Sequence, residues 1–330
     1  MGSCRHGTVK CEAVRKTQTG EAREQVMKLP DGVIGMAGRG PDWAAWVAGL
    51  PARATGLLDE WQLAKEGWPM HGYCSLVVPV RTGAGASAVL KIVFDGDEES
   101  EHEHLALRRW AGQGAVRLLR ADPRRRALLL ERLRPKDLTG VADLEACEVV
   151  AGLYPQLHVP ALPQLRTVTS YVERWCAALA EMPRNAPVPR RMVEQALSVA
   201  RDLVADPAST GVIVHGDLHY LNVLAAEREP WLVIDPKPMS GDPHYEPAPM
   251  LWNRMEELGA DVRSGVRRRF HALVDAADLD EARARDWVIV RMVLNAHWAV
   301  ADAGRANRGL TAEERDWITS CVAIVKAVQD

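Results

Sequence analysis

The chain has 330 residues, of which 47% are hydrophobic and 26% are charged, so it can bury the core of one large domain or of two lobes. Its formal net charge of −3 argues against a nucleic-acid partner, because domains that bind nucleic-acid phosphates are usually strongly basic. No apolar run approaches the roughly 18 residues that a membrane span needs, and six scattered cysteines without a C-x-x-C pair favour reduced thiols in a cytoplasmic protein.

The first part of the chain predicts a polar leader followed by a small sheet. Residues 1–25 are polar and charged and lack the apolar block of a signal peptide, so we expect a disordered leader or an added extension. A short helix is predicted at residues 41–50, where Pro and Asp occupy the first turn. Apolar runs typical of strands follow at 61–63, 75–80, 88–94, 115–119 and 127–133, with a turn at 81–85 and an acidic helix at 97–110.

From about residue 138 onward, apolar residues recur at the spacing of helices. Helices are predicted at 144–153, 167–179, 192–203, 245–258, 262–276, 283–301 and 312–328, and a β-loop-β block interrupts them at 212–235. We therefore expect an α+β fold of two lobes. Residues 26–134 are predicted to form an N-lobe with an antiparallel sheet and one key helix, and residues 135–330 a mainly helical C-lobe.

The segment with the clearest chemical signal lies in the β-loop-β block. Asp217 is followed by Asn222 five residues later, and Asp235 stands at the end of an apolar strand. Phosphoryl transfer to a hydroxyl needs a carboxylate that orients the alcohol and oxygen ligands for Mg²⁺. Mg²⁺ prefers a few carboxylate and amide oxygens and takes its other ligands from phosphates and water. Asp217 fits the role of base, and Asn222 and Asp235 fit the role of metal ligands.

Two other interpretations are compatible with parts of this segment. His215 and His219 have the H-x-x-x-H spacing that places two zinc ligands on one face of a helix. Gly216 and the β-rich surroundings disfavour a helix there, and no Glu follows His215 as it does in zinc proteases. A plain polar turn between two buried strands is the other alternative, but it does not explain why Asp, His and Asn crowd together.

These residues resemble a known family. His215-Gly216-Asp217, with Asn222 and Asp235, is similar to the catalytic loop and metal-binding Asp of the aminoglycoside phosphotransferase and choline kinase superfamily. Within that superfamily, residues 218–220, 234–238 and 241–254 resemble the streptomycin 6-phosphotransferase and hydroxyurea phosphotransferase family, and the likeness extends over residues 43–302. The resemblance implies a two-lobed protein-kinase-like fold, ATP or GTP as co-substrate, and two Mg²⁺ ions.

The resemblance also implies roles for residues of the N-lobe. Lys91, in the middle of a strand, would hold the α- and β-phosphates and pair with a helix glutamate, for which Glu103 is the choice and Glu99 the alternative. Residues 67–75 would form the phosphate loop, while Gly83 and Gly85 suit a hairpin turn. Backbone groups of Gly72 and Ser75 are expected at the phosphates, and those around Glu131 and Leu133 at the nucleotide base.

In the C-lobe the resemblance implies supporting groups and an acceptor pocket. His215, His219 and Asp242 would brace the catalytic loop and the metal-binding turn. Lys237 either tempers the charge of Asp235 or faces solvent. The pocket is expected after residue 246, and a cationic acceptor would call for carboxylates. The candidates are Glu246, Asp302, Asp261, Asp278 and Asp280, with Asp302 to be tested first.

The expected activity is that of a small-molecule kinase that inactivates an antibiotic. A streptomycin-like aminoglycoside is the leading acceptor, and hydroxyurea or another metabolite hydroxyl is the alternative. A non-catalytic pseudokinase would usually have lost one of Lys91, Asp217, Asn222 and Asp235, and a protein kinase would need a longer segment after Asp235. A small-molecule substrate is the expected partner, with no nucleic acid or membrane, and the chain is expected to be a monomer or weak dimer.

Overall fold

The computed structural model describes residues 27–329, so the leader predicted at residues 1–25 lies outside the described residues. The chain divides into two compact units. The described residues up to His104, together with Arg117–Arg132, form what we call the sheet unit, and Leu105–Val116 with the residues from Leu133 onward form the helical unit. The mixture of an antiparallel sheet and many helices confirms the predicted α+β class.

The sheet unit contains six antiparallel strands in the order β1-β3-β4-β6-β5, with β2 also paired to β3. The predicted hairpin turn around Gly83 and Gly85 joins β3 to β4. Strand β5 begins later than the predicted residue 115, because Ala115 instead forms an isolated parallel bridge with Val233. The strands are β1 Leu63–Lys65, β2 Met70–His71, β3 Ser75–Thr82, β4 Ser87–Val93, β5 Leu118–Asp122 and β6 Ala127–Glu131.

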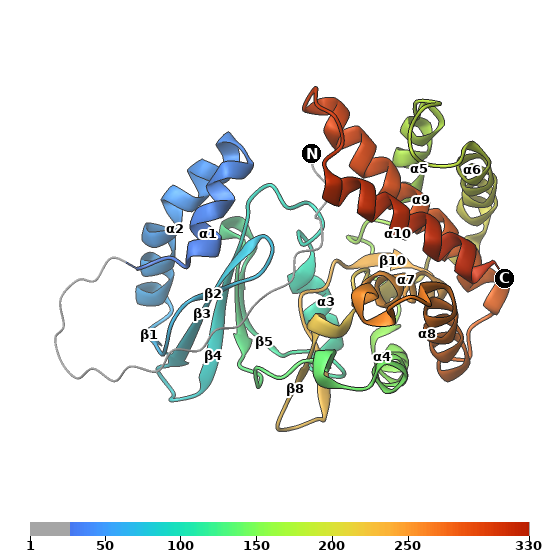
Figure 1. The fold of residues 1–330 in the computed structure, drawn as a ribbon. Helices are drawn as coiled ribbons and strands as arrows, with labels where there is room; N and C mark the ends of the chain where they lie inside the picture. The colour runs from blue at the N-terminus through green and yellow to red at the C-terminus, as the bar shows by residue number, and fades with distance from the viewer. Residues whose placement is uncertain (1–26, 330) are drawn as a thin grey trace. The chain divides into compact units, whose positions relative to one another are not determined.

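Two helices, α1 (Asp31–Met36) and α2 (Pro41–Glu60), lie on one side of this sheet (Figure 1). Helix α2 has 20 residues and continues through Pro51, whereas the predicted helix ended at Leu50. A proline inside a helix removes one hydrogen bond, but the helix continues because an apolar stripe packs on the sheet. The stripe comprises Trp46, Val47, Leu50, Ala54 and Leu57, all of which belong to the core of the sheet unit.

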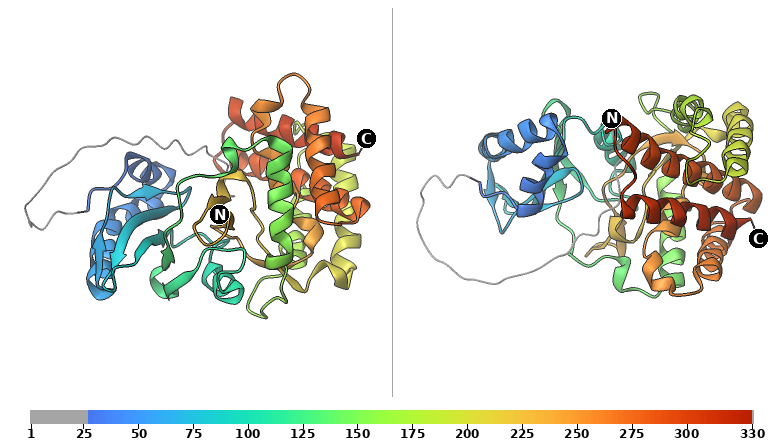
Figure 2. Two further views of the ribbon diagram at one scale, coloured as in Figure 1. Left: turned by 90° about the horizontal axis from the view of Figure 1, so that it is seen from below. Right: turned by 45° about the horizontal axis from the view of Figure 1, so that its top comes forward.

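The helices of the helical unit follow the prediction closely, and α9 and α10 run side by side (Figures 1 and 2). The predicted helix at 245–258 is broken, because Asn253 is extended and Arg254 is left-handed with φ 55°. The α-helices are α4 Asp143–Leu157, α5 Val168–Ala180, α6 Arg190–Ala205, α7 Ala248–Trp252, α8 Val262–Ala276, α9 Glu281–Arg305 and α10 Ala312–Val328. No helix in the described part of the chain is long and apolar enough to cross a membrane.

Helix α3 (Glu103–Trp110) is shorter than the predicted helix at 97–110. The carboxylate of Asp97 accepts hydrogen bonds from the backbone N–H of Glu99 and from Ser100 Oγ, which holds the chain in a turn. Two small antiparallel ladders complete the helical unit and frame the predicted reactive loop. β7 (Val212–Val214) pairs with β10 (Met239–Gly241), and β8 (Val223–Ala225) pairs with β9 (Trp231–Val233).

Replacing Leu50 by Ala is expected to destabilise the sheet unit by about 2–5 kcal/mol, because the fully buried side chain leaves a cavity under the sheet. Gly49→Ala is the matched control, since the added methyl group meets no atom within 4 Å and alanine favours a helix. Hydrogen exchange of the β3 and β4 amides measures both effects. Unchanged protection in Leu50→Ala would contradict the packing described here.

Candidate active site

The loop of residues 215–222 leaves β7 through a tight crossing with the chain before β10. Gly216 has φ 79°, and a Cβ atom placed there would lie 2.5 Å from the carbonyl oxygen of Lys237. The backbone N–H of Lys237 also donates to the carbonyl of His215 at 2.8 Å. Both the left-handed conformation and the close approach therefore require glycine at this position.

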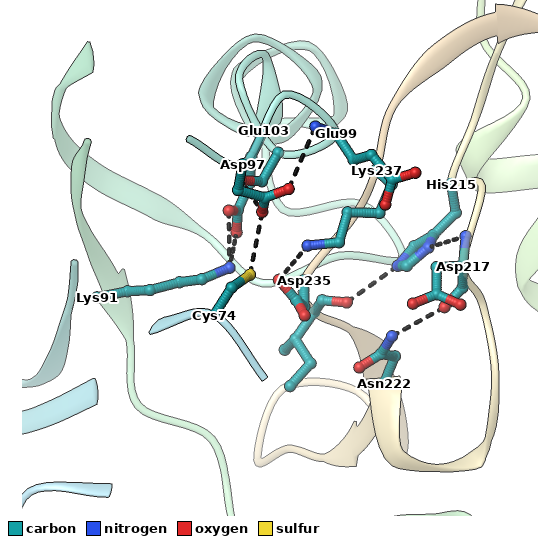
Figure 3. A network of polar contacts seen from close by, with 12 residues as sticks. Cys74, Lys91, Asp97, Glu99, Glu103, His215, Asp217, Asn222, Asp235 and Lys237 are labelled. Carbon is teal, nitrogen blue, oxygen red and sulfur yellow. Dashed lines mark hydrogen bonds and ion pairs between the residues drawn. The ribbon is translucent and has the colours of Figure 1, made fainter. Parts of the chain in front are cut away.

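Within this loop, Asn222 is fixed by its neighbours. Its Nδ2 donates to the carbonyl oxygen of Asp217 at 2.8 Å and lies 3.2 Å from Nε2 of His219. Because the amide nitrogen is used in this way, Oδ1 is the atom that Asn222 can offer to a cation. The Asp217 side chain keeps 28% of its surface exposed. The loop thus presents one accessible carboxylate beside one oriented amide (Figure 3).

Asp235 stands next to this amide because of the β8–β9 ladder. Val223 pairs with Val233, and the N–H of Ile234 donates to the carbonyl of Asn222 at 2.9 Å, which brings Asp235 to the same end of the ladder. Asp235 is left-handed, with φ 55°, and its side chain is 32% exposed. Lys237 Nζ lies 3.4 Å from Asp235 Oδ1, so the lysine is placed at this carboxylate and is itself buried.

The two histidines of the loop have partners within the protein. Nδ1 of the fully buried His215 accepts from the N–H of Asp217 at 3.3 Å, and its Nε2 lies 2.9 Å from the carbonyl of Ile234. The ring therefore joins the reactive loop to the segment after β9 that carries Asp235. Burial lowers the pKa of both histidines, that of His219 to about 4. Both rings are therefore neutral near pH 7.

Glu246 and Arg291 hold the backbone of the loop from two directions. The carboxylate of Glu246 accepts from the N–H groups of His215 and Gly216, and the guanidinium of Arg291 donates to the Gly216 carbonyl at 2.7 Å. Arg291 also donates to the carbonyl of Tyr245 at 2.8 Å, beside Glu246. The peptide groups just before Asp217 are therefore held by two buried, opposite charges.

This geometry corrects the expectation that Glu246 faces the substrate. The residue is 0% exposed, and both of its carboxylate oxygens are bonded to the loop backbone. Burial would raise the pKa of Glu246, but the neighbouring His158 side chain and the backbone N–H group of His215 lower it below the ordinary value. We interpret Glu246 as a positioning residue for the loop.

Sequence reasoning missed Arg291, although a signal was present. Arg291 interrupts the apolar run of residues 287–294 in α9, and a lone arginine in such a run usually has a buried partner.

Sequence reasoning also missed a second support of the loop, in which Tyr220 donates to Asp143 at 2.7 Å and Asp143 binds Arg269 at 2.8 and 2.9 Å. Tyr220 directly follows the His219 that the motif singled out.

Asp242 supports a different segment from the one expected. It accepts hydrogen bonds from His244 Nδ1 at 2.6 Å, from Arg283 Nε and from Trp287 Nε1 at 2.7 Å. These contacts fasten the turn after β10 to the first turns of α9. Asp242 therefore contacts α9, the helix whose Arg291 binds the 215–222 loop.

In the sheet unit, Lys91 forms a buried ion pair with Glu103. Lys91 Nζ lies 2.7 Å from both carboxylate oxygens of Glu103, the first residue of α3 (Figure 3). Lys91 is 6% exposed and Glu103 1% exposed, so the pair is shielded from solvent. Glu99, the alternative partner, instead donates its backbone N–H to Asp97. A buried pair of this kind fixes the lysine ammonium in one place.

Asp97, which the sequence did not single out, joins three segments of the sheet unit. Its carboxylate accepts from Cys74 Sγ at 3.0 Å and from Ser100 Oγ at 2.6 Å, and Arg126 donates to its backbone carbonyl (Figure 3 shows the cysteine and its acceptor). The carbonyl of Ser100 in turn accepts the N–H of Glu103 at 3.1 Å. The turn before β3 and the start of α3 are thereby tied to one carboxylate.

The expected backbone contacts to the nucleotide are only partly available. The N–H of Gly72 donates to the carbonyl of Ser75 at 3.0 Å, because the turn between β2 and β3 is so short that its ends pair. This N–H is therefore not available to a phosphate, contrary to the expectation for Gly72. The N–H of Glu131 likewise donates to the carbonyl of Arg117 at 3.0 Å. Contacts of Ser75 and Leu133 with a nucleotide stay predictions.

The acidic candidates for the acceptor pocket have different positions. Asp261 and Asp280 accept backbone N–H groups at the first turns of α8 and α9 and therefore act as helix caps. Asp278 is left-handed in the turn before α9, with φ 51°. Asp302, near the end of α9, has a side chain that is 18% exposed and forms an ion pair with Arg305 one turn later. Asp302 stays a candidate for acceptor binding.

The residues present fit a magnesium site. Asn222 and Asp235 offer one amide and one carboxylate oxygen at the same end of the β8–β9 ladder. In the part of the chain that the structure describes, no group of three or more His, Cys, Asp or Glu side chains could hold a metal ion. A sparse set of oxygen donors is the one that Mg²⁺ uses when phosphates and water complete its coordination.

Comparisons with known proteins point in one direction. The family model described as aminoglycoside/hydroxyurea antibiotic resistance kinase matches residues 60–303. The streptomycin 6-kinase of Streptomyces griseus is 40% identical over 90% of this chain and 97% of its own length. The hydroxyurea phosphotransferase of Kitasatospora aureofaciens is also 40% identical, over 81% of this chain and 77% of its own length.

A solved structure supports the fold. A thermostable mutant of an aminoglycoside phosphotransferase, in a ternary complex with ADP and hygromycin B, matches with a TM-score of 0.55. The identity is 17%, and the match covers 83% of this chain and 97% of that one. At this identity the likeness is one of fold, and it confirms the predicted kinase-like architecture.

Acid is expected to destabilise the helical unit through His219. Its pKa is about 4 in the folded protein and ~6.5 in an unfolded chain, so the unfolded state binds more protons between these values. The stabilisation is therefore complete above pH ~6.5 and is lost as the pH falls toward ~4, at about 1.4 kcal/mol per pH unit. Between pH 7 and pH 5, His219→Gln should lose about 2 kcal/mol less stability than the wild type in chemical denaturation. Equal losses in the two proteins would contradict this assignment.

Proposed function

Because the chain belongs to the aminoglycoside/hydroxyurea antibiotic resistance kinase family, we propose that it transfers the γ-phosphoryl group of ATP to a hydroxyl of a streptomycin-like aminoglycoside. The observation that carries this proposal is the nearly full-length likeness to a streptomycin 6-kinase. The constellation of Lys91, Asp217, Asn222 and Asp235 is complete, which favours an active enzyme over a nucleotide-binding pseudokinase.

Asp217 is the proposed base of the reaction. The acceptor hydroxyl donates its hydrogen bond to this carboxylate, which takes the proton as the hydroxyl oxygen forms its bond to the γ-phosphorus. The bond between that phosphorus and the bridging oxygen breaks at the same time, and ADP leaves with the bonding electron pair. The exposed Asp217 side chain is supported for this role because Asn222, Glu246 and Arg291 restrict the surrounding backbone.

Each unit carries residues that are proposed to bind the phosphate groups of the nucleotide. In the sheet unit, Lys91 is positioned by Glu103 and would bind the α- and β-phosphates through its ammonium group. In the helical unit, Asn222 and Asp235 would hold two Mg²⁺ ions, which supply positive charge to the transferred phosphate. Lys237 would limit the repulsion between Asp235 and the phosphates. GTP is the alternative co-substrate.

Hydroxyurea is the second candidate acceptor, because a hydroxyurea phosphotransferase is as similar to this chain in identity. The two acceptors differ in a way that an assay detects. A streptomycin-like aminoglycoside carries positive charge and many hydroxyls, whereas hydroxyurea is small and neutral. Phosphorylation of hydroxyurea alone would replace the leading proposal without changing the phosphoryl-transfer chemistry.

The proposal is tested by measuring acceptor-dependent ADP release with Mg-ATP or Mg-GTP and with streptomycin, other aminoglycosides or hydroxyurea. Streptomycin is expected to stimulate release, and Asp217→Asn is expected to lower kcat by about 10²- to 10³-fold, as the loss of a preorganised catalytic group commonly does. The melting temperature of the variant should match that of the wild type. If no aminoglycoside of the panel stimulates ADP release, the assignment of the acceptor is contradicted.

Asp97 is predicted to position the nucleotide-binding residues. Asp97→Asn weakens the bonds to Cys74 and Ser100, so the KM for ATP should rise by about tenfold while the KM for streptomycin is unchanged. Asp95→Asn is the matched control, since Asp95 is exposed and pairs with Arg53 instead. Cys74→Ser retains a donor and should behave like the wild type, whereas Cys74→Ala should raise the KM for ATP. Equal effects on both KM values would refute the positioning role.

A further inference from the structure

An aromatic cluster joins α5 to α9 in the helical unit. Tyr171 and Trp175 come from α5, and His297 and Trp298 come from α9. The ring centroids of Trp175 and Trp298 are 5.7 Å apart, those of Tyr171 and Trp298 are 6.0 Å apart, and those of Trp175 and His297 are 6.4 Å apart. We call these four residues the α5–α9 cluster.

The cluster contains polar atoms without partners. Nε1 of Trp175, Nε1 of Trp298 and both ring nitrogens of His297 are buried, and no described residue forms a hydrogen bond with them. His297 is 6% exposed, and burial lowers its pKa, so the ring is neutral and has one donor and one acceptor. Unpaired buried groups are costly and rare in folded proteins, so the four atoms of this cluster are free to form hydrogen bonds with a polar ligand or with buried water.

The cluster lies on elements that lead to the reactive loop. Arg291, Trp298 and Asp302 are spaced at 7 and 11 residues along α9, so they share one face of the helix. Arg291 binds the Gly216 carbonyl beside Asp217, and Trp298 follows it by about 10 Å along the helix axis. Helix α5 is also connected to the strands next to the loop. Thr167, at the start of α5, forms a bridge with Ser240 of β10, and β10 pairs with β7, the strand that precedes the reactive loop.

The cluster also has an open aromatic surface and one carboxylate close to it. Both indole rings are half-buried, so part of each ring is open to solvent. Asp302 follows Trp298 by one helical turn, and its charge acts on His297 together with the charge of Arg305. Arg174 lies over the Trp175 ring at 5.6 Å and Arg166 over the Tyr171 ring at 4.5 Å, so both α5 rings of the cluster already accept a cation on their faces.

We propose that the α5–α9 cluster, with Asp302, binds the part of the aminoglycoside that is not phosphorylated and thereby sets acceptor specificity. The indole faces stack on the acceptor ring, and the indole N–H groups and His297 pair with its hydroxyls after a small rotation of these side chains. Asp302 exchanges Arg305 for a guanidinium or ammonium group of the acceptor. This inference rests on the proposed aminoglycoside kinase activity.

The test uses substitutions that remove one N–H group and keep an aromatic ring. Trp175→Phe and Trp298→Phe should each raise the KM for streptomycin about 3- to 10-fold, which is the effect of losing one hydrogen bond. The kcat and the KM for ATP should stay within about twofold of the wild-type values. Trp61→Phe is the matched control, because Trp61 also has a buried Nε1 without a partner among the described residues but belongs to the sheet unit.

A second arm tests the charge. Asp302→Asn should raise the KM for streptomycin about tenfold but leave any turnover of the neutral hydroxyurea unchanged. Streptomycin should also quench tryptophan fluorescence less in Trp298→Phe than in the wild type. If streptomycin is turned over normally and its KM is unchanged in all three variants, buried water satisfies these nitrogens and the inference is overturned. If the wild-type enzyme shows no aminoglycoside-dependent ADP release, the proposed function fails and this inference fails with it.

Discussion

The geometry of the 215–222 loop depends on the hydrogen bonds that the buried carboxylate of Glu246 accepts. This carboxylate accepts N–H groups from His215 and Gly216, while Arg291 takes the carbonyl of Gly216. Removing either side chain would leave buried backbone groups of the loop without a partner, which costs about 1–3 kcal/mol for each group. The loop can therefore hold Asp217, an exposed and reactive side chain, because its backbone is fixed by groups that solvent does not reach.

The sheet unit uses the same physical device with different residues. Lys91 is positioned by the buried Glu103, and Glu103 begins a helix whose first turn is held through Ser100 and Asp97. In both units, a charged group proposed to touch substrate is oriented by a buried group of opposite charge or by the backbone. Low dielectric surroundings strengthen such contacts and make their loss expensive, so the geometry is both rigid and sensitive to substitution.

The sequence predicted the elements whose signals are local. Helices α8 and α10 were placed correctly because their apolar spacing is regular and their ends carry caps. The helix predicted at residues 41–50 ended too early, before Pro51, since only tertiary packing on the sheet shows why α2 continues. Asp217, Asn222 and Asp235 could be proposed as site residues because they share one short segment of the sequence. Arg291 and Asp97 could not be assigned, because their partners are brought to them only by the fold.

The division into units also has a consequence for anyone who wishes to separate them. The chain passes from one unit to the other after His104, again after Val116 and again after Arg132. A fragment cut at residue 134 would remove Trp110, which donates to the Leu157 carbonyl at 2.8 Å, and Val116, which donates to the Val233 carbonyl at 2.9 Å, from the helical unit. Neither unit can thus be produced as a single uninterrupted piece of chain. To express either unit alone, its two separate segments would have to be joined by a linker.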